Sequence, residues 1–109
     1  MFLIVSKYLI PKGYAAITFF PFIVLKHKNY LKSKTIINHE KIHIRQQLEL
    51  LILPFYLLYA ANYLYNCLKY KNVESAYRNI CFEREAYENE KNLNYIKSRS
   101  FWNFFRYLY

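Results

Sequence analysis

Two histidines and the glutamate beside the first of them form the group of residues best suited to metal chemistry in this sequence. They are His39, Glu40 and His43, in the pattern His-Glu-x-x-His. On a helix, residues four apart differ by about 40° in direction and about 6 Å in rise, so both imidazoles can reach one ion. Glu40 points about 100° away from His39, which leaves it beside the ion rather than among its ligands.

This pattern predicts a zinc ion with a catalytic base next to it. Imidazole is a common zinc ligand, and zinc lowers the pKa of a bound water to about 7. We expect Glu40 to take the proton from that water and to pass it to the leaving amine of a cleaved peptide bond. The chain has three histidines, and two of them fall in this pattern. The plain alternative is a solvated or hydrogen-bonded histidine pair.

A catalytic zinc site needs a third protein ligand and one open position. The same helix does not supply that ligand, because Gln46 and Glu49 stand where the extended pattern His-x-x-Gly-x-x-His requires Gly and His. A glutamate from a later segment is therefore expected. The candidates are Glu74, Glu83, Glu85, Glu88 and Glu90.

Glu83 and Glu85 differ in the neighbours that a helix would give them. The positions three and four residues from Glu83 are mostly apolar and include Ile80 and Ala86. Those around Glu85 are more polar, so we expect Glu85 near the surface, paired with Arg78 or a lysine. The two carboxylates would point about 200° apart, so only one can face the metal. We favour Glu83; the alternative is that all these glutamates are solvated partners of basic residues.

The N-terminal part of the chain is predicted to form a small sheet. Phe2–Ile10 and Tyr14–Lys26 have the composition of strands, and Pro11-Lys12-Gly13 between them is a turn signal. We therefore expect these two runs to pair as an antiparallel hairpin. Pro21 lies inside the second run and predicts an edge strand or a bulge, because proline cannot donate to a sheet ladder.

The rest of the chain has helical periodicity. Ser33 or Thr35 can cap a helix that carries the two histidines and ends near Leu51. Pro54 starts a strongly apolar helix. The other helical segments are predicted at residues 73–95, with a break near Asn79, and at residues 98–109.

These elements predict an α+β fold in a single domain over residues 1–109. A small N-terminal antiparallel hairpin would pack on the active-site helix, beside an apolar helix, a glutamate-bearing helix and a short C-terminal helix. A chain of 109 residues is long enough for one hydrophobic core and too short for a second domain.

The sequence resembles the gluzincin metallopeptidases, in particular their small stand-alone forms, the minigluzincins, which are about as long as this chain. The resemblance rests on His39-Glu40-x-x-His43 followed by Gln46, on an apolar stretch with a proline, and on Phe82-Glu83-Arg84-Glu85-Ala86-Tyr87. It implies a zinc-dependent peptide-bond hydrolase. Glu83 would be the third zinc ligand, because Glu83 and Ala86 match the Glu-x-x-Ala segment of the family.

The same resemblance implies how a peptide or protein substrate would bind. In the family an edge strand lines the cleft, and Thr18–Lys26 would take that role and pair with an extended substrate. Tyr87 stands where many relatives have an aspartate that supports the ligands. Gluzincins often stabilise the oxyanion with a Tyr or His from a C-terminal subdomain that this chain lacks, so Tyr77 and Tyr87 are the candidates here.

A peptidase of this minimal size raises the possibility of a latent form, a zymogen. The tail Phe101–Tyr109 is rich in aromatic residues and has few charges. One hypothesis is that the tail packs over the cleft and blocks it. The other is that it completes the hydrophobic core.

Two other classes of function compete with the peptidase. The net charge of +9 favours anionic partners such as lipid headgroups or nucleic acid, but no nucleic-acid-binding motif is present. Glu49 and Pro54 interrupt the apolar run Leu48–Leu68, so we expect a core or interfacial helix rather than a membrane span. We predict a cytoplasmic protein, soluble or peripherally bound to a membrane. The alternative function is a non-catalytic membrane-associated protein or a zinc-binding pseudo-enzyme.

Overall fold

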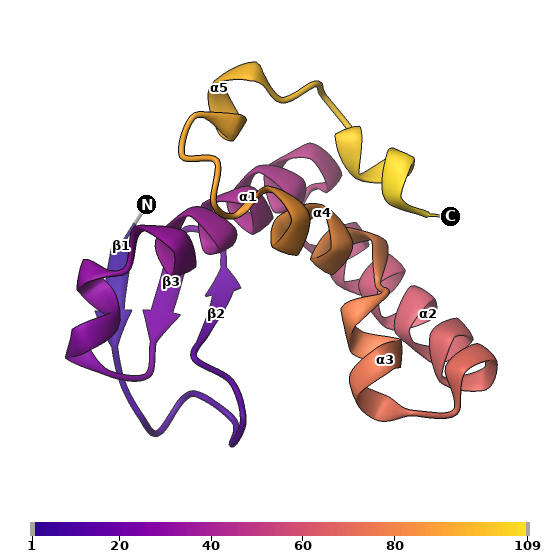
Figure 1. Ribbon diagram of the computed structural model, residues 1–109, viewed down its shortest axis with the longest axis horizontal. Coiled ribbons are helices and arrows are strands. Elements are labelled where there is room, and N and C mark those ends of the chain that lie inside the picture. Colours follow the sequence, from indigo (N-terminus) through magenta and orange to yellow (C-terminus); the bar gives the residue numbers. More distant parts are fainter. Residues whose placement is uncertain (1, 109) are drawn as a thin grey trace.

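The helix that carries the two histidines lies at the centre of the molecule (Figure 1). The computed structural model describes residues 2–108. Helix α1 (Lys34–Leu50) packs against the sheet, against α2 (Leu53–Tyr70) and against α4 (Cys81–Asn89), and α3 (Val73–Arg78) packs on α2. The remaining helical elements are the 3-10 helix η1 (Lys28–Lys32), α5 (Tyr95–Ser98) and the 3-10 helix η2 (Asn103–Tyr107). The fold is α+β, as predicted.

The sheet has three strands in the order β1-β3-β2. They are β1 (Phe2–Val5), β2 (Ala16–Phe19) and β3 (Phe22–Leu25). An antiparallel hairpin is present, but β2 and β3 form it within the second predicted run, and β1 pairs with β3 in parallel. The expected hairpin between the two predicted runs is therefore wrong. Pro21 lies in the tight turn after a cis peptide bond, where proline interrupts no ladder hydrogen bond.

The helix boundaries follow local signals. The Ser33 hydroxyl accepts a hydrogen bond from the Ile36 amide at 3.3 Å and caps α1. Pro54 lies in the first turn of α2, where its missing amide proton costs no helical hydrogen bond. The third helical region breaks near Asn79 as predicted, but α4 ends at Asn89 rather than near Tyr95.

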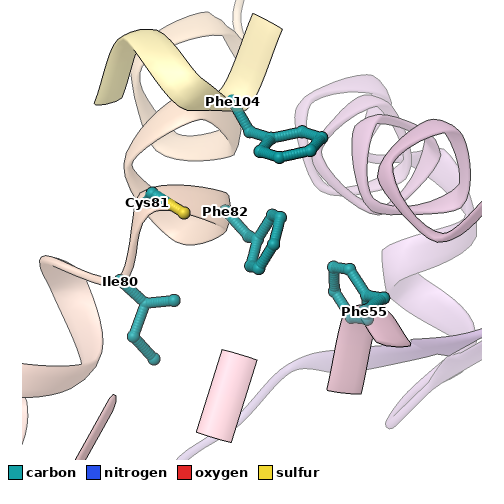
Figure 2. Packing of buried hydrophobic residues seen from close by; sticks show 5 residues of the cluster. All are labelled: Phe55, Ile80, Cys81, Phe82 and Phe104. Atoms are coloured by element: carbon teal, nitrogen blue, oxygen red, sulfur yellow. The ribbon is translucent and has the colours of Figure 1, made fainter. Parts of the chain in front are cut away.

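Three phenylalanines form the centre of the largest core cluster (Figure 2). The ring centroid of Phe82 lies 4.6 Å from that of Phe55 and 4.9 Å from that of Phe104. Phe104 comes from the tail and is buried, and residues 101–108 do not line the cleft that holds the histidines. The hypothesis that the tail covers the cleft is therefore wrong for residues 101–108, which instead contribute Phe104 to the core; Tyr109 lies outside the described residues.

Helix α2 is buried along one narrow face. Of its 18 residues, Phe55 and Asn66 are buried. Within residues 2–108, no single helix is long and apolar enough to cross a membrane. Helices α1 and α2 reach that length and hydropathy when taken together, but the chain bends by 111° between them.

Candidate metal centre

Three side chains from two helices meet at one point. Nε2 of His39 and Nε2 of His43, both on α1, are 3.2 Å apart. Oε1 of Glu83, on α4, lies 3.2 Å from each of these nitrogens. The three atoms form a nearly equilateral triangle, and the three residues that carry them are buried, with 5–7% of their surface exposed. The structure thus brings together the three residues predicted as zinc ligands.

The triangle has the size that a tetrahedral zinc site requires. Zinc lies about 2.0–2.1 Å from imidazole nitrogen and carboxylate oxygen, so its ligands are separated by about 3.3–3.4 Å in a tetrahedral arrangement. The observed separations of 3.2 Å are close to this value. Two nitrogens and one oxygen suit zinc and other divalent transition metals. The residues present therefore fit a metal ion, and three ligands leave one position open.

The electrostatics of the cluster favour a bound cation. Burial alone would raise the pKa of Glu83, but His43 and His39 lower it well below its usual range. Burial alone would lower the pKa of His43, but the Glu83 carboxylate, helped by Glu40, raises it to about 9. Positive charge and carboxylate stabilise each other here, so a metal ion can take the place of the proton on His43.

Gln46 fixes the orientation of His43. Its side-chain oxygen can only accept, so Nδ1 of His43 donates to it at 2.8 Å. In the neutral ring this leaves the lone pair on Nε2, which faces Glu83. The Gln46 amide nitrogen in turn donates to the Phe82 carbonyl at 3.1 Å and to Oε1 of Glu85 at 2.8 Å. The i+3 spacing after His43 is the sequence signal for this role, which the sequence analysis did not assign.

Glu83 and His39 have supporting contacts of their own. The Tyr59 hydroxyl of α2 donates to Oε2 of Glu83 at 2.7 Å and leaves Oε1 toward the histidines. A carboxylate oxygen of Glu90 lies 3.6 Å from Nδ1 of His39, and the Tyr87 ring packs on His39 at 4.5 Å between centroids. Tyr59 could not be identified from the sequence, because no spacing relates α2 to the histidine pattern.

Glu40 lies beside the triangle without belonging to it. One of its carboxylate oxygens is 3.8 Å from Nε2 of His39, farther than Glu83 is. Glu40 also falls within a His39-Glu40-His43 group whose ligand atoms lie within 4.8 Å of one another, but the shorter distances favour Glu83 as the ligand. Burial raises the pKa of Glu40, and the two histidines offset this in part. The Thr18 hydroxyl donates to the carboxylate at 3.1 Å.

Glu85 points away from the histidines, and the prediction that it lies near the surface, paired with Arg78 or a lysine, is wrong. Glu85 is fully buried rather than near the surface. Arg99 donates to both of its carboxylate oxygens, at 2.5 and 3.0 Å, and Tyr95 donates a further hydrogen bond at 2.5 Å. The expected partner, Arg78, instead lies 3.8 Å from the ring centroid of Tyr87. The segment after α4 folds over Glu85, so neighbours on its own helix could not reveal this burial.

The histidines line a cleft of about 880 Å³. The cleft lies between the β2 edge of the sheet and helices α1, α2, α3 and α4. Its aromatic lining comes from Tyr14, Phe19, Phe55, Tyr56, Tyr59, Tyr77 and Tyr87. The hydroxyls of Tyr77 and Tyr87 are 3.4 Å apart, and burial raises the pKa of both, so both are neutral donors at pH 7. Among the other candidate ligands, Glu74 and Glu88 are exposed.

The predicted edge strand lines the cleft only through β2. The central strand of the sheet is β3, so the later half of Thr18–Lys26 has no free edge. The Lys26 amide donates to the Ala15 carbonyl, so Ala15 faces β3. Hydrogen-bonded and non-hydrogen-bonded pairs alternate along an antiparallel ladder, so the N–H and C=O groups of Ala16 and Thr18 point away from β3, toward the free edge of β2.

Gln47 already occupies part of this outward edge. Its amide nitrogen donates to the Thr18 carbonyl at 3.0 Å, and its oxygen accepts from the Phe20 amide at 2.7 Å. The Tyr56 hydroxyl also donates to the Thr18 carbonyl, at 2.6 Å. The expectation that a substrate pairs along the strand from Thr18 onward therefore needs correction. Pairing at this edge is confined to the stretch around Ala16.

A cluster of two histidines and one glutamate does not by itself identify a family, because similar sites occur on unrelated folds. The case for a metal centre therefore rests on the residues of this chain and their geometry. No protein-family model, curated protein or solved structure matches the chain.

Proposed function

We propose that this protein is a zinc-dependent peptide hydrolase of the gluzincin type. His39, His43 and Glu83 hold the ion, and Glu40 is the general base. The observation that supports this most strongly is the triangle of 3.2 Å contacts that the two imidazoles form with a carboxylate 40 residues away in sequence. Three ligands at the wall of an open cleft match the design of catalytic zinc sites.

When bound, zinc supplies a Lewis acid that polarises the scissile carbonyl and lowers the pKa of the attacking water. Glu40 accepts the proton of that water and delivers it to the departing amine. Burial raises the pKa of Glu40, so this carboxylate accepts a proton more readily than a solvated glutamate would. The hydrogen bond from Thr18 holds the carboxylate in place.

The cleft favours an extended peptide with apolar side chains. The outward backbone groups of Ala16 can pair with a substrate strand, and the aromatic walls can accept its side chains. Tyr77 and Tyr87 provide neutral hydroxyls at the cleft wall and are our candidates for stabilising the developing oxyanion.

A zinc-binding pseudo-enzyme is the alternative function. Structural zinc sites are normally closed by four protein ligands. The carboxylate of Glu40 beside a three-ligand cluster, in a cleft of about 880 Å³, favours catalysis over a purely structural role.

The proposal is tested with purified protein, a zinc titration and a peptide library analysed by mass spectrometry. We expect one zinc ion per chain and cleavage at apolar positions. The Glu40→Gln variant, prepared in the same way, should keep the zinc and lose about 10²–10⁴-fold in turnover. Zinc binding without any cleavage would favour the pseudo-enzyme, and a protein that binds no zinc would overturn both.

A further inference from the structure

The outward face of α2 carries a stripe of leucines that no other part of residues 2–108 covers. Leu53, Leu57, Leu64 and Leu68 recur at helical spacing and are between 63% and 81% exposed. The chain has no charged residue from Leu50 to Leu68. The stripe therefore presents to water an apolar strip roughly 22 Å long, at 1.5 Å rise per residue.

Exposed aromatic side chains of the tail lie near the corner that precedes α2. The Trp102 indole donates to the Glu49 carbonyl at 3.3 Å, which places Trp102 beside the corner between α1 and α2. The Trp102 ring centroid lies 5.2 Å from that of Phe101 and 5.8 Å from that of Phe105, and all three residues are exposed. At the same corner Leu51 is 77% exposed. Exposed tryptophan next to leucine is typical of proteins at a membrane–water interface.

The exposed charge is almost entirely positive. Glu40, Glu83 and Glu85 are buried, and Glu49 is paired with Arg99 at 2.6 Å. The exposed acidic residues of the described chain are Glu74 and Glu88. The exposed basic residues are Lys7, Lys12, Lys28, Lys32, Lys34, Arg45, Lys69, Lys71, Arg78, Lys91, Lys97 and Arg106. The surface is thus more one-sided than the net charge of +9 indicates.

We propose that the leucine stripe of α2 and the tail aromatics dock on the surface of an anionic lipid bilayer. The leucines and aromatic rings would enter the boundary of the acyl chains, while exposed lysines and arginines contact the headgroups. A second copy of the chain fits this face less well, because two molecules with a charge of +9 repel each other. Nucleic acid matches the charge but offers no apolar surface to the leucines. Docking does not require the metal centre.

Vesicle flotation of the full chain tests this inference. The vesicles contain phosphatidylcholine alone or with phosphatidylglycerol. We expect the protein to float with the anionic vesicles and to bind the neutral ones at least tenfold more weakly. High salt should weaken the binding, because it screens the attraction to the headgroups.

Leu57→Glu/Leu64→Glu should reduce binding to anionic vesicles at least tenfold. The matched control is Leu31→Glu/Leu93→Glu, which makes the same charge change at exposed leucines outside α2 and should bind nearly as well as the parent. Circular dichroism and zinc titration should be the same for all three proteins. If the α2 double variant does not fold, Leu68→Glu at the most exposed leucine of the stripe replaces it.

Three outcomes would overturn the inference. The first is that the parent protein does not bind anionic vesicles, and the second is that the α2 double variant binds them as well as its control does. The third is a dimer in analytical ultracentrifugation that the α2 substitutions dissociate, because a second copy would then be the occupant of this face. Loss of zinc binding with intact flotation would count against the metal centre alone.

Discussion

Glu83 and Glu85 stand two residues apart on α4, and both are buried, yet their surroundings are opposite. Glu85 is neutralised within the protein by two hydrogen bonds from Arg99. Glu83 faces two imidazoles and a tyrosine, and within residues 2–108 no lysine or arginine lies within ion-pair distance of it. A buried carboxylate is costly unless a cation compensates it. The chain therefore supplies a permanent cation for Glu85, whereas Glu83 has only the protonated His43, whose place the proposed metal ion would take.

The largest expected effect comes from removing the cation that compensates Glu85. In metal-free protein, Arg99→Met leaves the buried Glu85 without its cation and should lower the free energy of unfolding by about 3–5 kcal/mol. Urea unfolding measures this loss. Adding Glu85→Gln to the variant should restore part of the stability, because the uncompensated charge is then gone. A loss below about 1 kcal/mol would show that Arg99 is not the main compensating group.

The next effect tests the link between the two carboxylates. Gln46 joins His43 to Glu85, so Gln46→Leu should lower zinc affinity about 10–100-fold by freeing the imidazole to turn. Gln47→Leu is the matched control. Gln47 is also buried on α1, but it binds β2 instead of a zinc ligand. Equal losses of zinc affinity in the two variants would mean that the effect comes from general destabilisation.

The smallest effect concerns acid stability. Burial alone would raise the pKa of Glu85, but the hydrogen bonds from Arg99, Tyr95 and Gln46 lower it below the usual 4.5. Glu85 therefore adds stability that is fully present above pH 4.5 and is lost as the pH falls through its lowered pKa. Unfolding of metal-free protein between pH 6 and 3 should show this loss, at most about 1.4 kcal/mol per pH unit. The Glu85→Gln variant should lack that component, and an unchanged pH profile would contradict this assignment.

Sequence patterns predicted the local features of the fold and of the candidate site. The Ser33 cap, the start of α2 near Pro54 and the α+β class follow from short-range signals. The pattern of apolar neighbours on α4 favoured the face of Glu83 that turns toward α1. These features depend on residues within one or two turns of each other, which periodicity reports directly.

Features that depend on distant segments were missed. The parallel pairing of β1 with β3 follows from long-range contacts that no turn signal encodes. Glu85 looked exposed because its burial comes from Tyr95 and Arg99, which lie ten and more residues later. Tyr59 reaches Glu83 from another helix for the same reason. Helix periodicity describes only the neighbours on the same helix.

The most direct test of the central claim is a zinc titration of Glu83→Gln and Glu85→Gln against a competing chelator. Both variants replace a buried carboxylate with an amide of the same shape. We expect Glu83→Gln to lower zinc affinity more than about 100-fold, because loss of a residue that only supports a ligand costs about 10–100-fold. Glu85→Gln should change zinc affinity by less than about tenfold. If Glu85→Gln is the variant that loses zinc, the metal ion does not bind at the triangle of His39, His43 and Glu83.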